Sequence, residues 1–326
     1  MIGSFFMNPF TNNLIFSLNA TVPVFLIMVF GGLIKKAGII DENATDKINN
    51  LVFKVLLPVL LFKDLSTADF LSVWDTKFVL FCIIATLVSI GIAALISLFH
   101  KDKTERGEII QASYRSSAAI LGIAFVNNIY GHTTMAALMI AGTVPIYNIA
   151  AVTVLSFTSP QADKSAGKKK LIVRTLLSVI KNPVIIGVFA GIIWSVIKIP
   201  QPVIFEKSIS YLSNMATPLS LMALGASVKF REAKEKLPVA ALITAIKLLL
   251  FCIIFLPIAV TLGFRDEKLI AILVMLGSAT TGSSFVMSKN FGHNGTITAC
   301  AVMLTTLFSS FTLTAWLFIL KTLSLI

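Results

Sequence analysis

The sequence predicts an all-α membrane protein whose ten transmembrane helices form two inverted five-helix repeats. Three observations lead to this prediction. Of the 326 residues, 56% are hydrophobic and only 13% are charged, whereas charged residues make up about 25% of a typical soluble domain. Ten segments are apolar over a length that can cross a bilayer, and the two halves of the chain match at a constant offset.

The ten apolar segments follow one another with short connections. A spanning helix needs about 20 mostly apolar residues. The sixth segment could instead begin on the membrane surface, because Arg174 and Lys181 precede its helix-start residues Asn182 and Pro183. We expect the helices at 14–35, 45–65, 78–99, 107–130, 134–157, 172–197, 203–228, 238–262, 268–290 and 295–322.

A repeat emerges when the chain is compared with itself at an offset of 160 residues, the separation of Pro23 and Pro183. Each half then holds five spans, and because five is odd, the second half enters the membrane upside down. We therefore predict a first repeat at 1–158, a cytoplasmic linker at 159–170 and a second, inverted repeat at 171–326. Further equivalent positions hold the same residue without a gap: Gly31 and Gly191, Lys47 and Lys207, Pro58 and Pro218, and Phe70 and Phe230.

The basic residues set the expected orientation. The net charge is +12, and alternate loops hold 16 Lys and Arg residues on one side against 7 on the other. The richer side is expected to be cytoplasmic, which puts both termini outside the cell in a plasma-membrane protein. Because these residues lie beside apolar spans, they argue against nucleic-acid binding. The run 168–170 in the linker is expected to be solvated near anionic lipid headgroups, with a regulatory role as the alternative.

Small and polar residues interrupt the fourth and ninth spans at equivalent positions, 113–122 and 277–284. Regular helical hydrogen bonding is easily lost in such stretches, and non-helical backbone is tolerated inside a membrane only against protein or a wet cavity. Paired breaks in two repeats predict a substrate site near the membrane midplane. Facing helix ends would aim N-terminal dipoles at an anion.

Four basic residues fall within or beside the apolar spans rather than in the polar loops. An ionisable residue inside a membrane costs about 2.5–3.5 kcal/mol and is functional by default. Arg115 lies in the first break, where its guanidinium could bind a carboxylate through two parallel hydrogen bonds; the alternative is that it snorkels or holds backbone carbonyls. Lys54 shares a helix face with Asn50 and is open to either interpretation. Lys181 belongs to the uncertain sixth segment, and for Lys247 we expect a structural role.

The spans lack carboxylates at their centres, since the nearest acids, Asp64 and Glu108, lie toward span ends. A midplane sodium or proton site usually uses a carboxylate, so the sequence favours an anionic substrate over cation antiport and leaves the coupling ion open. Pro58 and Pro218 are expected to break the second and seventh spans, with Asn50, Asn214, Thr217 and Ser220 near the freed carbonyls. The alternative is a packing kink in which these polar groups contact neighbouring helices.

No nucleotide-binding loop, metal-ligand spacing or catalytic constellation is present in the sequence. We therefore expect no enzyme activity, no cofactor and no metal.

Several motifs resemble the auxin efflux carrier family, whose bacterial members resemble malonate and malate permeases. They are Asn182-Pro183, the run 216–227 (ATPLSLMALGAS), Leu56-Leu57-Pro58, Arg115 to Gly122, Phe285 to Gly292 and Thr305 to Ser309. The resemblance implies a dimeric ten-span carrier with a scaffold and a moving transport domain, in which the fourth and ninth spans cross and hold the substrate. Carried over to this chain, the implied substrate-binding residues are Arg115, Ser116, Ser117, Ala118, Gly122, Gly277, Ser278, Thr280, Thr281 and Gly282.

Two departures from the family pattern affect these breaks. The family's Arg-Gly-Asn is Arg115-Ser116-Ser117 here, and Ala124 stands near its later proline. The ninth span also lacks a proline at its break.

The sequence thus predicts a secondary transporter that moves a small organic anion across the plasma membrane by alternating access. A mono- or dicarboxylate such as malate or malonate, or an auxin-like acid, is the expected substrate. The expected partners are that anion, the lipid bilayer and a second copy of the chain. Two alternatives stay open, a sodium-coupled symporter on the same fold and a membrane sensor that binds a ligand without moving it.

Overall fold

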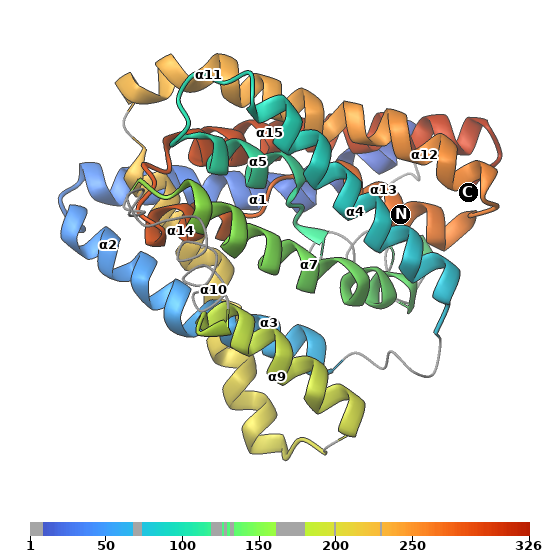
Figure 1. The fold of residues 1–326 in the computed structure, drawn as a ribbon, viewed down its shortest axis with the longest axis horizontal. Helices are drawn as coiled ribbons and strands as arrows, with labels where there is room; N and C mark the ends of the chain where they lie inside the picture. The colour runs from blue at the N-terminus through green and yellow to red at the C-terminus, as the bar shows by residue number, and fades with distance from the viewer. Residues whose placement is uncertain are drawn as a thin grey trace, which may run out of the picture.

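The fold is all-α, as predicted. The computed structural model describes residues 9–67, 74–118, 126, 129–130, 134–160, 180–198, 200–228 and 230–326, and within these ranges it contains no strand. In chain order the elements are α1 (Pro9–Lys36), α2 (Glu42–Leu51), η1 (Val52–Leu56), α3 (Leu57–Ser66), α4 (Thr76–Ser97), α5 (Arg106–Tyr114), α7 (Thr134–Thr158), α9 (Pro183–Ile197), α10 (Val203–Ser227), α11 (Phe230–Ala245), η2 (Ile246–Leu250), α12 (Phe251–Thr261), α13 (Asp266–Gly277), α14 (Ser283–Asn290) and α15 (Thr296–Thr322) (Figure 1).

Four helical stretches in the described part of the chain are long and apolar enough to cross a membrane. They are α4, α7, α15 and the continuous stretch Arg231–Thr261, which joins α11, η2 and α12. The helix α9 is apolar but shorter. Composition and length therefore support a membrane protein, while the full set of ten spans stays a prediction.

Short polar side chains fix where several helices begin. The carboxylate of Asp41 accepts a hydrogen bond from Ala44 N at 2.6 Å at the start of α2. Asp75 accepts one from Phe78 N at 3.0 Å at the start of α4. Asn182 does the same for α9 and is followed by Pro183 at the first helical position. Such caps satisfy amide groups that have no partner within the helix.

The two prolines expected to break spans do not do so. Pro218 lies inside α10, which runs without interruption from Val203 to Ser227. Pro58 is the second residue of α3, directly after the π-helical turn η1, and α2, η1 and α3 follow one another without a gap. A proline removes one backbone donor, and a local π-helical adjustment or neighbouring groups can accommodate that loss in a helix.

Glycines bring two pairs of helices into close contact. A Cβ on Gly225 of α10 would stand 1.8 Å from the carbonyl oxygen of Met28 on α1. On α9, a Cβ at Gly187 would stand 2.4 Å from the carbonyl oxygen of Pro58 on α3. These distances leave no room for any side chain, so α1 packs on α10 and α9 packs on α3 through their backbones.

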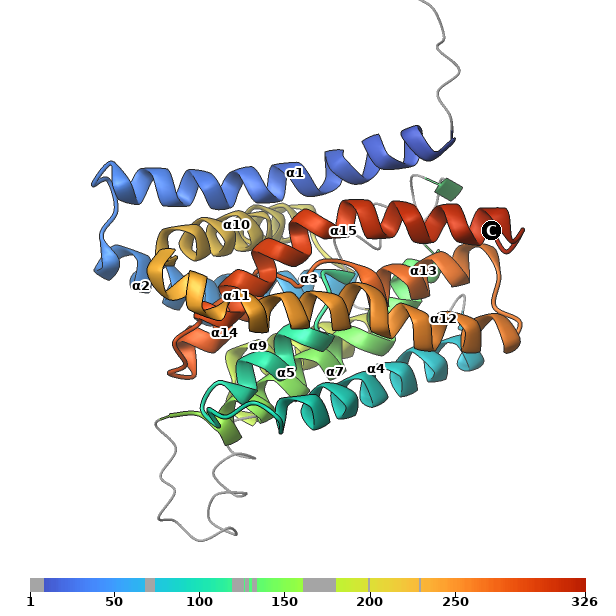
Figure 2. The same ribbon diagram turned by 90° about the horizontal axis from the view of Figure 1, so that it is seen from above.

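Helix α1 lies along one edge of the molecule and α4 along the opposite edge (Figure 2). The described chain begins and ends at the same end of the molecule, where α1 starts and α15 stops (Figure 1). The shorter helices α5 and α13 lie in the core: every residue from Gly107 to Tyr114 and from Leu269 to Gly277 is buried. Both of these buried helices end at a predicted break.

Candidate functional site

The two predicted breaks contact each other. After α5 ends at Tyr114, Arg115 adopts an extended conformation (φ −79°, ψ 113°), and after α13 ends at Gly277, Ser278 does the same (φ −79°, ψ 163°). The two extended stretches pair in antiparallel fashion, with Ser116 opposite Thr280. Ser117 N donates to Ala279 O at 2.9 Å. Each break thus satisfies part of the other's backbone, as buried non-helical backbone requires.

Hydroxyl groups satisfy further carbonyls at this junction. Thr280 Oγ1 donates to the carbonyl of Ala112 in α5 at 2.8 Å. The carbonyl of Met275 in the last turn of α13 accepts hydrogen bonds from Ser116 Oγ and from Tyr147 OH. The carboxyl end of each short helix is therefore held by a hydroxyl from another segment.

A cavity of about 60 Å³, lined by both apolar and polar side chains, adjoins the paired breaks. This volume exceeds the space that one water molecule needs by several-fold. We name it the break pocket. It is lined by Leu57, Leu60, Leu61, Asp64, Arg115, Ser116, Ser117, Ala118, Val144, Tyr147, Asn148, Thr217, Ser220, Thr281 and Ser283.

Arg115 is a buried cation on the wall of the break pocket. Its residue is only 4% exposed, and its guanidinium donates to Asn148 Oδ1 at 2.7 Å and to the sulfur of Met287. No ion pair with a carboxylate forms among the described residues. A buried charge of this kind is expensive unless an opposite charge compensates it.

Lys247 is a second buried cation at the same junction, and it is fully buried in the π-helical turn η2. Its Nζ donates to the carbonyl of Tyr114 at 3.0 Å and to Ser116 Oγ. The sequence predicts a structural role for Lys247, but it does not predict these two contacts. Sequence separation explains why: Lys247 lies more than 130 residues from both of its partners.

The structure brings most of the predicted binding residues to the two breaks. Arg115 to Ala118 and Thr281 line the break pocket, and Thr280 lies in the bridge beside it. Ser283, which was not predicted as a binding residue, also lines the pocket. Gly277 ends α13, and Gly282 precedes α14. Ser278 is fully buried, and its hydroxyl has no hydrogen-bond partner among the described residues. The predicted binding residue Gly122 lies outside the described residues.

Three predicted site residues do not reach the breaks. Asn50, Lys54 and Asn214 are exposed on the outside of the described structure. The Asn50 side chain donates to the carbonyl of Asp46 in its own helix, and none of the three lines the break pocket. Being near a proline within a helix does not decide which side of that helix faces the site.

Other residues of the break pocket were not predicted as binding residues. Asn148 and Tyr147 come from α7, and Asp64 comes from α3. In the sequence Asp64 lies toward the end of the second span, away from the predicted site, yet the arrangement of α3 brings it to the pocket. A buried asparagine and tyrosine in an apolar helix are the kind of polar residues that could have been noticed in the sequence.

Glu108 caps a distant helix from within α5. Its residue is 1% exposed. One carboxylate oxygen accepts from Gly295 N at 2.9 Å, and the other accepts from Thr298 N at 3.0 Å and Thr298 Oγ1 at 2.9 Å. These are groups at the start of α15, which has no local side-chain cap. A carboxylate at a helix N-terminus is favourable for both hydrogen bonding and the helix dipole.

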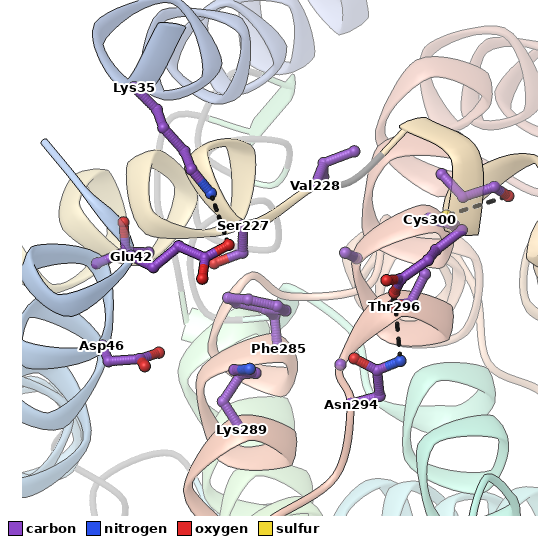
Figure 3. Close-up of a pocket in the computed structure, with 15 residues that line it drawn as sticks. Lys35, Glu42, Asp46, Ser227, Val228, Phe285, Lys289, Asn294, Thr296 and Cys300 are labelled. Carbon is purple, nitrogen blue, oxygen red and sulfur yellow. Dashed lines mark hydrogen bonds and ion pairs between the residues drawn. The ribbon is translucent and has the colours of Figure 1, made fainter. Parts of the chain in front are cut away.

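A second pocket, of about 100 Å³ and with a more polar lining, lies farther along α14 (Figure 3). Phe285 and Lys289 of α14 face it, together with Lys35 and Glu42, whose side chains form an ion pair at 3.7 Å. Its charged groups carry both signs, and it contains none of the predicted binding residues. The break pocket is therefore the better candidate for the substrate site.

Comparison with known proteins gives a consistent result across the chain. A family model described as membrane transport protein matches residues 16–317. The chain is 25% identical over 307 residues to a protein of Rhizobium meliloti (strain 1021) named "Putative malonate transporter", which covers 91% of this chain and 95% of that protein. It is 24% identical over 254 residues to an uncharacterized transporter of Methanothermobacter thermautotrophicus, covering 76% and 80%. It is 20% identical over 285 residues to the uncharacterized transporter YfdV of Escherichia coli (strain K12), covering 85% and 89%.

Proposed function

The chain belongs to the membrane transport protein family, as its resemblance to the auxin efflux carriers predicted, and from that premise we propose that it carries a small organic anion. It is a transporter and not an enzyme. The proposed substrate is a mono- or dicarboxylate such as malonate or malate, or an auxin-like acid. The proposed binding site is the break pocket.

The observation that carries this proposal is the buried guanidinium of Arg115. It lines the break pocket, and in the described structure its hydrogen bonds go to the neutral side chains of Asn148 and Met287. A carboxylate substrate would supply the missing negative charge. A carboxylate carries the opposite charge and can accept two parallel hydrogen bonds from a guanidinium, so it competes well with a neutral amide and a thioether for these donors.

The neighbouring groups support an anion at the same place. Thr281 and Ser283 line the pocket at the start of α14, where backbone N–H groups and the helix dipole favour negative charge. The hydroxyl of Ser117 adds a donor that could orient the substrate, whereas that of Ser220, also in the lining, donates to the carbonyl of Thr217 at 2.8 Å. The carboxylate of Asp64 in α3 also lines the pocket and repels a substrate with a high negative charge, so we expect a substrate with few carboxylates.

The proposed mechanism is alternating access by two inverted repeats. One pair of contacts supports the repeat: a Cβ on Gly31 would stand 2.1 Å from the carbonyl oxygen of Met222, and one on Gly191 would stand 2.9 Å from that of Phe62. Gly191 is the repeat equivalent of Gly31, and Met222 lies 160 residues after Phe62. Two contacts related by the sequence offset are expected when two repeats pack with pseudo-symmetry. A homodimer in the plasma membrane with extracellular termini belongs to the same proposal.

The test is uptake of labelled malonate, malate and indole-3-acetate into liposomes that contain the purified protein, with Arg115→Gln beside the wild type. Loss of a buried, paired charge contact costs about 3 kcal/mol, so we expect Arg115→Gln to weaken anion binding by at least about 100-fold. Lys54→Gln is the matched control, because Lys54 is exposed and lies outside the break pocket. It should bind and transport like the wild type.

A folded Arg115→Gln protein that transports the anion at the wild-type rate would refute the proposed site. Ligand binding without uptake under any ion gradient would instead support the sensor alternative.

A further inference from the structure

The carboxyl ends of α5 and α13 converge on one side chain, that of Lys247. The carbonyl of Tyr114, the last residue of α5, accepts a hydrogen bond from Lys247 Nζ at 3.0 Å. Ser116 Oγ accepts a second one, and this hydroxyl in turn donates to the carbonyl of Met275 in the last turn of α13. A helix carboxyl end carries roughly half a negative charge. The ammonium group therefore carries the charge that balances two such ends.

The ammonium group of Lys247 is paired with oxygen atoms of the backbone and of a hydroxyl rather than with a carboxylate. The side chain is fully buried, and in the described structure no carboxylate pairs with it. It lies in η2, which packs against α5, α11, α12, α13 and α15. A buried ammonium without a carboxylate partner is stable only where carbonyl and hydroxyl oxygens take its hydrogen bonds.

Carbonyls of unwound backbone and the carboxyl ends of half-helices are also the ligands that transporters offer to a coupling sodium ion. In this chain the ammonium of Lys247 occupies such ligands at the α5 break. We propose that Lys247 is a tethered cation that takes the place of a coupling sodium ion at this junction, so that transport proceeds without sodium. This inference rests on the proposed anion transport and separates it from the sodium-coupled alternative.

The first experiment compares uptake by the wild-type protein with sodium and with N-methylglucamine as the only cation on both sides of the liposome membrane. We expect rates that agree within about twofold, because the cation position is already filled. A rate that falls more than about tenfold without sodium would overturn the proposal.

The second experiment measures cation binding directly and does not depend on transport. Lys247→Ala removes the ammonium but leaves the carbonyl of Tyr114 and the hydroxyl of Ser116 in place. Methylammonium or sodium should then bind in the vacated space and raise the unfolding temperature of the variant by about 2 °C at several times its dissociation constant. The control is Lys54→Ala, which removes an exposed lysine. Neither this variant nor the wild type should show a cation-dependent rise in the unfolding temperature.

The outcomes separate the two proposals. If the wild type transports no anion, the proposed function fails, and the temperature shift still decides on Lys247. If Lys247→Ala shows no more cation stabilisation than Lys54→Ala, the tethered-cation proposal is wrong. If Lys247→Ala does not fold, Lys247→Met keeps the apolar volume of the side chain, and its uptake should fall at least about tenfold. Unchanged uptake by Lys247→Met would overturn the proposal.

Discussion

The buried carboxylate of Glu108 gives the sharpest stability prediction. It is the only side chain in the described structure that caps the start of α15, through Gly295 N, Thr298 N and Thr298 Oγ1. We consider two substitutions. Glu108→Ala removes the carboxylate, and Glu108→Gln keeps the size of the side chain but removes its charge.

The magnitude follows from the three hydrogen bonds. Each hydrogen bond to a charged group contributes about 1.5–3 kcal/mol, and a buried donor left without a partner costs about 1–3 kcal/mol. The cost of desolvating the carboxylate offsets part of the stabilisation from these hydrogen bonds. We therefore expect Glu108→Ala to lower the free energy of unfolding by about 3–5 kcal/mol. Glu108→Gln retains one acceptor oxygen but turns an NH₂ group toward donors, and should cost about 2–3 kcal/mol.

The assay is unfolding by sodium dodecyl sulfate titrated into dodecylmaltoside micelles, followed by tryptophan fluorescence. The control is Glu42→Gln, whose carboxylate is 69% exposed and forms an ion pair with Lys35 at 3.7 Å. Such a surface pair contributes at most about 1 kcal/mol. If Glu108→Ala unfolds at the same detergent fraction as Glu42→Gln, the capping argument is wrong.

Two further predictions concern the ends and the contacts of helices. The hydrogen bond from Lys268 Nζ at 2.6 Å, together with one from a backbone N–H, lowers the pKa of Asp75 below its usual 3.8. The charged form therefore stabilises the fold, and above pH 4 the Asp75→Asn variant should be less stable than the wild type by about 0.5–1 kcal/mol. This difference should vanish when unfolding is measured at pH values falling below 4, because Asp75 then becomes protonated in the wild type. Gly225→Ala places a Cβ against the carbonyl of Met28 and should destabilise the protein by about 1–3 kcal/mol in the same detergent titration. The control is Gly91→Ala, whose Cβ meets no atom within 4 Å, and it should be neutral or stabilising. Equal effects of the two substitutions would contradict the close packing of α1 on α10.

The all-α fold and the position of both breaks could be predicted because their signals are local. A run of small and polar residues inside an apolar segment is visible without knowing what it contacts. The stretches 113–122 and 277–284 each contain the point where the described helix ends, at Tyr114 and Gly277. Arg115 was found in the same way, as a charge in an apolar run.

The partners of these residues could not be predicted, because they depend on which helix faces meet. Lys54 and Lys247 are both lysines within apolar spans, yet Lys54 is exposed and Lys247 is fully buried against the first break. Periodicity relates residues three or four positions apart, and it says nothing about a contact across more than 100 residues. The same limit explains why Asn214 was expected at the site and Asn148 was not.

The contacts of Lys247 also bear on the two interpretations that the sequence left open for Arg115. One was that its guanidinium holds backbone carbonyls at the break and so has no charge to offer a ligand. In the structure the carbonyl at the end of α5 is taken by Lys247, while Arg115 donates to an amide oxygen and a thioether. These neutral acceptors are weaker than a carboxylate, and replacing them in the pocket breaks no backbone hydrogen bond of either short helix. Because Lys247 binds the carbonyl at the end of α5, the guanidinium of Arg115 stays available to bind an anion. Holding the helix end and binding the anion therefore require two different residues.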